Sequence, residues 1–249
     1  MTAVVLIPAR LASQRLPNKP LLPVAGRALI LRVVDVARAA GLGEPIVACG
    51  DAAIAEAVRA EGGRAVLTDS GLPSGTDRVR AALAEIDPQG ALDPIINLQG
   101  DLPLLPAAAL TALLEALAAD PEAGMATLAA PSDDPEERQN PNVVKAVLAR
   151  RAPPRPARAL YFTRAPAPWG NGPIHHHIGV YAYRRTVLEQ ICALDPSPLE
   201  RRERLEQLRA LEAGVSIAVA ELAKATFGVD TAGDLARASA EFQERENEL

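Results

Sequence analysis

Three cationic side chains stand close together near the start of the chain, in a segment that follows directly on a short apolar run. They are Arg10, Arg15 and Lys19, and three prolines lie in the same segment, 8–21. Arginine offers a planar fork of donors to phosphate oxygens, and lysine a compact charge that can follow a leaving group. Three such cations can also form no more than a solvated basic loop. Because prolines stiffen the segment and a strand precedes it, we favour a fixed loop that binds a triphosphate.

Two aspartates, far apart in the sequence, are candidates for holding a divalent cation. Asp101 follows Gly100 at the end of an apolar run, and Asp230 lies just before the last helical pattern. A carboxylate at the tip of a central strand can hold a hard cation against phosphate oxygens. Asp101 by itself could equally be the N-cap of the next helix. Two acids that converge on one crevice make a better site than either alone.

A run of small polar residues, Ser-Gly-Thr-Asp-Arg at 74–78, precedes another helical pattern. Taken locally, this run is a capping turn in which Ser74 or Thr76 satisfies free backbone amides.

Three consecutive histidines, His175, His176 and His177, precede an apolar run. Neighbouring residues of an extended segment point to alternate faces, so three adjacent histidines cannot all bind one metal ion. We therefore assign no metal to them.

These side chains need a scaffold, and the first half of the chain predicts a parallel sheet. Short apolar runs alternate there with helical patterns, which is typical of strands joined by crossover helices. Ligands of such folds bind beyond the carboxyl ends of the strands. The predicted strands are 4–7, 45–49, 65–67 and 94–98, and the predicted helices are 29–40, 52–61, 75–85 and 106–119.

The pattern changes after Met125. A Pro/Arg-rich stretch, 150–158, predicts a surface loop. The charged stretch 199–213 has leucines at helical spacing and predicts one amphipathic helix. A closing helix over 231–245 has Thr231 as its N-cap. The remaining predicted strands are 126–130, 143–148, 160–163, 178–183 and 215–220.

Composition excludes several classes of protein. The 249 residues are 49% hydrophobic, enough for one large core or two modest ones. A formal net charge of -5 argues against a broad nucleic-acid interface. No stretch sustains the roughly 20 apolar residues of a membrane span, so we expect a cytoplasmic protein with no membrane partner. Cys49 and Cys192 lie outside any zinc-binding or disulfide pattern.

Several of these motifs resemble, in the same order, those of the 3-deoxy-manno-octulosonate (Kdo) cytidylyltransferases, or CMP-Kdo synthetases. The resemblance extends from about 4 to 235. The motifs that carry it are the opening loop 8–21, Ser-Gly-Thr-Asp-Arg at 74–78, Gln-Gly-Asp at 99–101, His-x-Gly-x-Tyr-x-Tyr-Arg at 177–184, Leu-Glu-Gln-Leu-Arg at 205–209 and Gly-Val-Asp-Thr at 228–231. The chain departs from the family after its second strand, where Cys49-Gly50 replaces a commoner Thr-Asp and leaves Asp51 one place late.

The resemblance implies a fold and a reaction. The fold is α/β, a Rossmann-like three-layer α/β/α arrangement with a mixed, mostly parallel sheet, of the nucleotide-diphospho-sugar transferase type. It would form a single catalytic domain with a core of 1–127 and 205–249 and an inserted dimerisation and sugar-binding region of about 128–204. The reaction transfers CMP from CTP to Kdo, releases pyrophosphate and activates Kdo for lipopolysaccharide biosynthesis. Mg²⁺ would be the cofactor, and the protein a homodimer.

The resemblance also assigns roles to individual residues. It makes Lys19, Asp101, Asp230 and Arg10 catalytic, with Asp101 and Asp230 as the metal ligands. The residues assigned to CTP are Ala9, Arg10, Arg15, Lys19, Ser74, Gly75, Thr76, Arg78, Gln99 and Asp101. The residues assigned to the sugar acid are Arg78, Gln99, Arg164, His177, Tyr181, Glu206 and Gln207. On the residues alone, Arg164 could equally be a surface arginine beside a strand.

Other functions stay open at this point. The nearest is a cytidylyltransferase for another acidic sugar, such as an amino-Kdo analogue or a sialic acid, although the motif at 205–209 argues against sialic acid. A second alternative is a protein that binds nucleotide without catalysing a reaction, because a fold alone never proves activity. The joint presence of Lys19, Asp101 and Asp230 disfavours it. A purely structural dimer would leave the three-cation loop unexplained.

Overall fold

A computed structural model of the chain describes residues 2–12 and 15–247. The chain divides into two compact units, which are Met1–Ala108 with Thr226–Leu249, and Ala109–Ala225. We call them unit 1 and unit 2. These bounds differ from those of the expected core and inserted region, which stay a prediction.

Unit 1 contains four parallel strands in the order β5-β4-β1-β6. β1 is buried over six consecutive residues, as expected for a strand with both faces covered. The strands are β1 (Thr2–Ala9), β4 (Ile46–Cys49), β5 (Arg64–Leu67) and β6 (Leu92–Asn97). The other elements are η1 (Lys19–Leu21), β2 (Pro23–Val24), β3 (Arg27–Ala28), α1 (Leu29–Ala39), α2 (Ala52–Ala60), α3 (Gly75–Ile86) and α9 (Ala232–Asn247).

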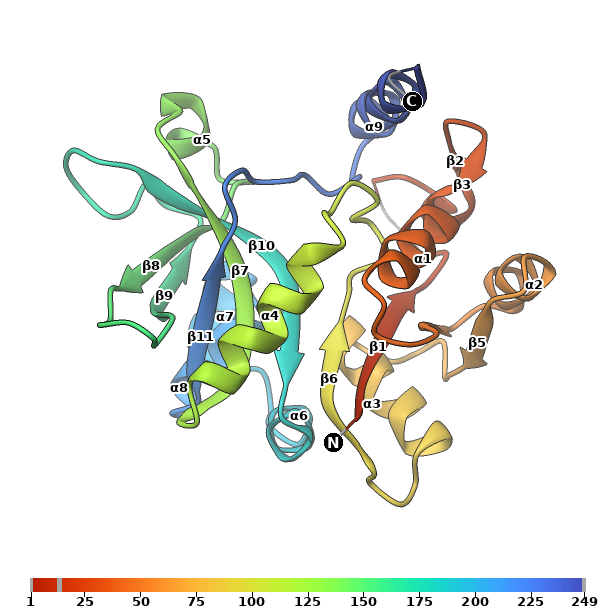
Figure 1. The fold of residues 1–249 in the computed structure, drawn as a ribbon, viewed down its shortest axis with the longest axis horizontal. Coiled ribbons are helices and arrows are strands. Elements are labelled where there is room, and N and C mark those ends of the chain that lie inside the picture. Colours follow the sequence, from red (N-terminus) through yellow and green to blue (C-terminus); the bar gives the residue numbers. More distant parts are fainter. Residues whose placement is uncertain (1, 13–14, 248–249) are drawn as a thin grey trace. The chain divides into compact units, whose positions relative to one another are not determined.

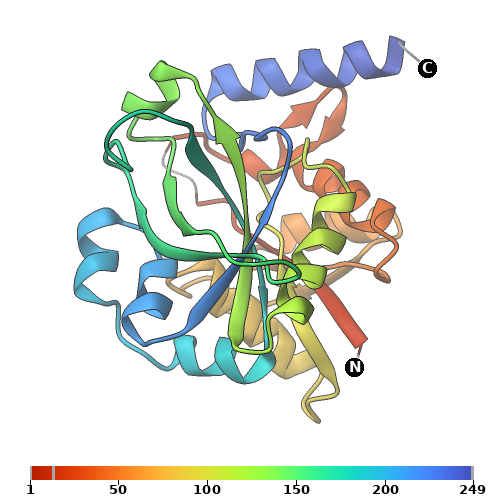
Figure 2. The same ribbon diagram turned by 60° about the vertical axis from the view of Figure 1, so that its left-hand side comes forward.

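The strand order of unit 1 explains where its helices lie. The chain passes from β1 through α1 to β4 and through α2 to β5, and then returns through α3 to β6 on the other side of β1. Right-handed crossovers therefore place α1 and α2 on one face and α3 on the opposite face (Figure 1). The last helix, α9, runs beside the β2–β3 hairpin (Figure 2).

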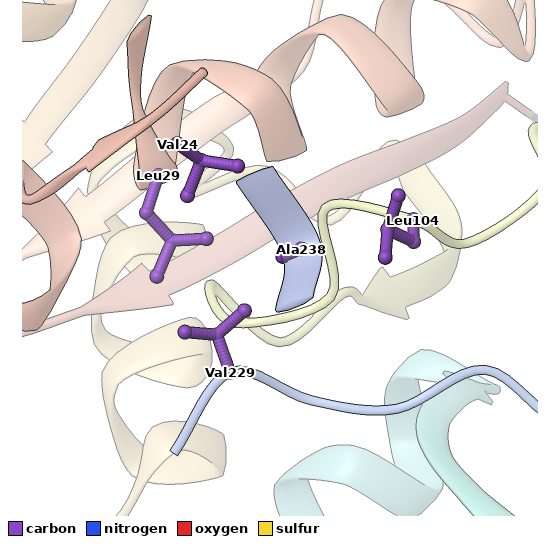
Figure 3. Close-up of a cluster of buried hydrophobic side chains, with 5 residues drawn as sticks. All are labelled: Val24, Leu29, Leu104, Val229 and Ala238. Carbon is purple, nitrogen blue, oxygen red and sulfur yellow. The ribbon is translucent and has the colours of Figure 1, made fainter. Parts of the chain in front are cut away.

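One hydrophobic cluster of unit 1 joins segments that are distant in the sequence. We call it the Val229 cluster (Figure 3). It consists of Val24, Leu29, Leu104, Val229 and Ala238, and Leu16, Phe227, Leu235 and Phe242 pack against it. Burial of these side chains fixes the opening loop, the segment after β6 and the segment before α9 to one another.

Unit 2 contains five strands in the order β10-β7-β11-β9-β8. β10 also pairs with β8, so the order closes on itself. β7 and β11 are parallel, and the other pairs are antiparallel. Figure 1 shows α4 in front of this sheet and α8 behind it, where α8 packs on β9 and β11. The strands are β7 (Ala123–Ser132), β8 (Lys145–Ala149), β9 (Ala157–Thr163), β10 (Ile174–Tyr183) and β11 (Ser216–Glu221).

The helices of unit 2 differ from the prediction. The expected single helix over 199–213 is wrong, because Arg204 has φ 57° and divides it into α7 and α8. A left-handed residue cannot continue an α-helix, and the break leaves Leu205 buried. Two further helices, α5 and α6, were not predicted. The helices are α4 (Ala108–Ala119), α5 (Pro135–Gln139), α6 (Arg185–Cys192), α7 (Pro198–Glu203) and α8 (Gln207–Glu212).

In the described part of the chain, no helix combines the length and the apolar character that crossing a membrane requires.

Candidate functional site

Opposite charges from three distant segments meet in unit 1. Lys19 Nζ donates to Asp101 Oδ2 at 2.8 Å and to Asp230 Oδ1 at 3.0 Å. Arg15 Nη2 lies 2.9 Å from Asp230 Oδ2. The two aspartates therefore converge on one ammonium group, as their pairing in the sequence analysis required.

The Val229 cluster is the reason that these charges meet. Val229 is buried directly before Asp230, and its N–H donates to the carbonyl of Asp101 at 2.9 Å. Leu16 packs on the same cluster, between Arg15 and Lys19 in the chain. Apolar neighbours thus hold each charged side chain near the others, although 211 positions separate Lys19 from Asp230.

Burial and pairing act in opposite directions on Lys19. Burial of its ammonium group lowers the pKa, but Asp101 and then Asp230 raise it by more, so the pKa lies above its ordinary 10.5. The Lys19 side chain is only 15% exposed, whereas that of Arg15 is 62% exposed. The Lys19 ammonium group is therefore paired and largely shielded from water, whereas the Arg15 guanidinium is largely exposed.

The paired aspartates suit a divalent cation. Mg²⁺ is commonly bound by one or two carboxylates, with phosphate oxygens and water as its other ligands. Among residues 2–12 and 15–247, no three or more His, Cys, Asp or Glu side chains gather as a metal site. Two convergent carboxylates of Asp101 and Asp230, already sharing one cation, fit Mg²⁺ that is held partly by substrate phosphates.

The end of β6 passes very close to the end of β1. A Cβ at Gly100 would lie 2.9 Å from the carbonyl oxygen of Pro8, so a larger residue would push the strands apart. A Cβ at Gly75 would lie 3.3 Å from Cγ of Pro8 and 3.4 Å from Oε1 of Gln99. Glycine at these two positions lets the start of α3 and the turn before Asp101 close on the end of β1.

The Ser74–Arg78 segment is a capping turn, as local reasoning expected. Ser74 is the N-cap of α3 and accepts the N–H of Asp77 at 3.1 Å. Thr76 has a different partner, because its hydroxyl accepts a hydrogen bond from Asn97 Nδ2 at 3.3 Å. Gln99 Nε2 donates to Asn97 Oδ1 at 3.0 Å. Buried Asn97 therefore fixes both side chains. Asn97 was not among the predicted site residues, although an amide at the end of an apolar run was the available signal.

Arg78 is 2% exposed and holds a loop of its own unit. Its Nη1 donates to Thr68 Oγ1 at 2.6 Å and to the carbonyl of Asp69 at 3.0 Å. Burial, and after it the charge of Arg10, lowers the pKa of the Arg78 guanidinium. The guanidinium is thus engaged by the protein, and a contact with CTP or the sugar stays a prediction.

Unit 2 places His177 in a buried, uncharged setting. The Thr127 hydroxyl donates to the carbonyl of Val180 at 2.9 Å, so its oxygen accepts from His177 Nε2, 3.0 Å away. A hydroxyl has one hydrogen, so assigning it to Val180 makes His177 the donor through Nε2 and leaves Nδ1 as an acceptor. Burial lowers its pKa to about 3. Thr127 was also missed, although a threonine within an apolar strand was its signal.

Tyr181 lies beside His177, with ring centroids 5.7 Å apart. Phe162 meets His177 edge to face, with centroids 4.8 Å apart. Burial raises the pKa of the Tyr181 hydroxyl, and the Glu206 carboxylate raises it further. Two residues assigned to the sugar, His177 and Tyr181, therefore lie side by side, and we call them the unit 2 cluster; the charge of a third, Glu206, acts on Tyr181.

The three adjacent histidines diverge, as the alternation of a strand predicts. His175 Nε2 lies 3.5 Å from Glu221 Oε2, whereas His176 Nδ1 lies 3.4 Å from Glu137 Oε2. His177 points to Thr127. They do not form one metal site.

Two more residues assigned to the sugar differ in how their polar groups are used. Gln207 Nε2 is buried and has no hydrogen-bond partner in the part of the chain that the structure describes. Arg164 instead donates to the carbonyls of Glu203 at 2.8 Å and Pro141 at 2.9 Å, so it ties two segments of unit 2 together. Contact between Arg164 and a sugar carboxylate stays a prediction.

Cations and acids that meet close to the ends of parallel strands can bind phosphate oxygens and a divalent cation. Similar proteins show that the class is that of the α/β nucleotidyltransferases. The family model described as cytidylyltransferase matches residues 4–217. A solved CMP:2-keto-3-deoxy-manno-octonic acid synthetase complexed with CTP is 38% identical, with a TM-score of 0.89, over 98% of this chain and 100% of that one. A putative glucose-1-phosphate thymidylyltransferase from Bacillus anthracis, 19% identical with a TM-score of 0.65, shares the fold over 96% of this chain and 95% of its own.

Curated relatives narrow the class to one family. The 3-deoxy-manno-octulosonate cytidylyltransferase of Rhodospirillum centenum is 56% identical over 95% of this chain and 92% of its own length. The enzyme of the same name from Parvibaculum lavamentivorans is 54% identical over 97% of this chain and 93% of its own. The chain belongs to the 3-deoxy-manno-octulosonate cytidylyltransferase family.

Proposed function

We propose that this enzyme transfers CMP from CTP to 3-deoxy-manno-octulosonate and releases pyrophosphate. The observation that carries the proposal is the meeting of Lys19 with Asp101 and Asp230, at 2.8 and 3.0 Å, beside the cationic loop after β1. A cation next to paired carboxylates is the arrangement that metal-assisted transfer at a phosphate requires.

The cationic loop supplies the triphosphate contacts. Arg10 and Arg15 are exposed and offer donors to phosphate oxygens. Lys19 leaves its aspartates for the phosphates when CTP binds, and its charge then offsets the charge that develops on the departing pyrophosphate. Asp101 and Asp230 would hold Mg²⁺ at that stage. Such an ion supplies charge neutralisation and lowers the pKa of a hydroxyl bound to it.

Catalysis by these residues is mainly positioning. The C2 hydroxyl of the sugar attacks the α-phosphorus in line, the new P–O bond forms as the bond to pyrophosphate breaks, and the hydroxyl proton is released. Gln99, fixed through Asn97, and Gly75 line the end of β1 and suit the cytidine.

The unit 2 cluster supplies neutral hydrogen-bonding groups for the sugar acid. Neutral His177 accepts a hydrogen bond through Nδ1, and the Tyr181 hydroxyl stays protonated and can donate. The buried, unpartnered Nε2 of Gln207 needs an acceptor, which a sugar oxygen would supply.

Homodimer formation through about 128–204 and a cytoplasmic location belong to this proposal. Both stem from the sequence expectations.

The test is a panel of sugar acids, incubated separately with CTP and Mg²⁺ while pyrophosphate release is measured. We expect Kdo to give the highest kcat/KM, and omission of Mg²⁺ to abolish release. A higher kcat/KM with an amino-Kdo analogue or a sialic acid would change the assigned substrate. CTP binding without release from any sugar acid would indicate a protein that binds nucleotide without catalysis.

A further inference from the structure

The hydrogen bonds between β1 and β4 end in an unusual way. Beyond the last strand pair, the N–H of Gly50 donates to the carbonyl of Ala9 at 3.2 Å. A continued parallel ladder would next have the N–H of Leu11 donate to the carbonyl of Gly50. Instead, it donates to Asp51 Oδ2 at 2.8 Å. A carboxylate therefore takes the place of the backbone acceptor.

Asp51 is also the N-cap residue of α2, yet its side chain makes no capping hydrogen bond. The first amides of α2 bond to its backbone carbonyl, with Ile54 N–H at 3.2 Å. An aspartate at an N-cap commonly stabilises its own helix by about 1 kcal/mol through its side chain. The Asp51 side chain does not cap α2. It accepts a hydrogen bond from the loop after β1 instead.

The backbone amide that bonds to Asp51 belongs to the cationic loop after β1. Leu11 directly follows Arg10, which is exposed and has no carboxylate partner in the described residues. The charge of Arg10 acts on Arg78, whose guanidinium is itself held by Thr68 and Asp69. A cation with a fixed backbone and no partner in the protein is available to an anionic ligand.

We propose that Asp51 is a positioning residue for CTP: its carboxylate fixes the Arg10–Leu11 backbone and so holds Arg10 ready for the phosphates. This inference rests on the proposed function. The role proposed for Asp51 needs only its acceptor oxygen, which an asparagine side chain also has. Asparagine at position 51 should therefore keep the hydrogen bond to the Leu11 amide. Serine should cap α2, but its side chain is too short to reach that amide.

The test compares Asp51→Asn with Asp51→Ser. Hydrogen exchange of the Leu11 amide reports on the hydrogen bond without any substrate, and calorimetry with CTP reports on affinity. We expect Asp51→Ser to lose protection at Leu11 and to bind CTP about 10-fold more weakly, which is about 1.4 kcal/mol. Asp51→Asn should keep the protection and bind CTP within about 3-fold of the unsubstituted protein.

Asp134→Ser is the matched control, because Asp134 is an N-cap whose side chain does cap its helix, through Glu136 N–H at 2.8 Å. It should leave CTP affinity unchanged. The proposal is overturned if Asp51→Ser binds CTP normally after losing Leu11 protection, or if Asp51→Asn weakens binding as much as serine does. Failure of the sugar panel, with CTP still bound, would refute the proposed function and leave this inference standing.

Discussion

The polar sites of unit 1 and unit 2 differ in the charge of their side chains. In unit 1, the ammonium group of Lys19 lies within 3.0 Å of carboxylate oxygens of both Asp101 and Asp230, so opposite charges are paired. In unit 2, His177 is 8% exposed and stays neutral, since burial lowers its pKa to about 3. The Tyr181 hydroxyl likewise stays protonated.

Under the proposed function, the difference matches what each site would hold. A triphosphate carries several charges, so its site needs cations and acids whose charges are already in place. A sugar is read mainly through hydroxyl groups, for which neutral donors and acceptors of fixed direction are better suited. Substitutions should therefore act through charge in unit 1 and through hydrogen bonding in unit 2.

The largest expected effect tests charge in unit 1. Asp101→Asn removes one of the two carboxylates that face Lys19, and we expect pyrophosphate release to fall by at least about 10²-fold. Initial rates at saturating CTP and Kdo measure this. The melting temperature should change by less than about 4 °C, the shift that about 1 kcal/mol produces in a chain of this size.

The control is Asp35→Asn, which removes the same charge from a surface pair with Arg27, 2.8 Å apart. Its rate should equal that of the unsubstituted enzyme. A near-normal rate for Asp101→Asn would contradict the role of paired charges.

The next effect tests neutrality in unit 2. Because the pKa of His177 is about 3 in the folded protein and 6.5 ordinarily, the unfolded chain binds more protons between these values. Stability is therefore present above pH 6.5 and is lost as pH falls toward 3, by up to about 1.4 kcal/mol per pH unit. His177→Gln should make this fall shallower, as measured by urea unfolding from pH 8 to 4.5.

His175→Gln serves for comparison, since burial also lowers the pKa of His175 but to a smaller extent. It should alter the pH dependence less than His177→Gln. If the free energy of unfolding falls equally steeply with pH in the unsubstituted protein and in both variants, His177 is not held neutral.

A smaller effect tests hydrogen bonding in unit 2. Tyr181→Phe keeps the ring beside His177 and removes only the hydroxyl, so we expect KM for Kdo to rise about 5-fold and KM for CTP to stay constant. Tyr161→Phe, whose hydroxyl faces Glu203 at 3.4 Å, should change neither. A parallel rise in both KM values would show that the effect is not specific to the sugar.

The smallest effect concerns the most exposed cation. Arg15→Ala removes an ion pair whose arginine is 62% exposed, so the free energy of unfolding should change by less than about 1 kcal/mol. KM for CTP should rise about 3-fold at low salt and by less at high salt, because salt screens exposed charges. A rise in KM for CTP that is the same at low and high salt would show that Arg15 makes a buried contact.

The charged residues that meet in unit 1 could be predicted from residue types and motifs, whereas their roles toward substrate stay predictions. The cations of the first loop, the two aspartates and the strand that carries His177 were all predicted from motifs, and the alternation of apolar runs predicted the parallel strands of unit 1. Asn97, Thr127 and Asp51 were missed as supporting residues. Each acts through a partner distant in sequence, 21 positions away for Asn97 and 40 for Asp51, and no local pattern reports such a partner.

Sequence by itself determined the four parallel strands of unit 1 and the helices between them, because periodicity and capping are local properties. It did not indicate η1 or the β2–β3 hairpin. It also determined which side chains could carry charge at the ends of those strands. Only the tertiary structure decided which charges meet, since burial of Leu16, Leu104 and Val229 in one cluster brings Lys19 to Asp101 and Asp230. It also decided that His177 is neutral, because the pKa of a side chain depends on the burial and partners that folding gives it.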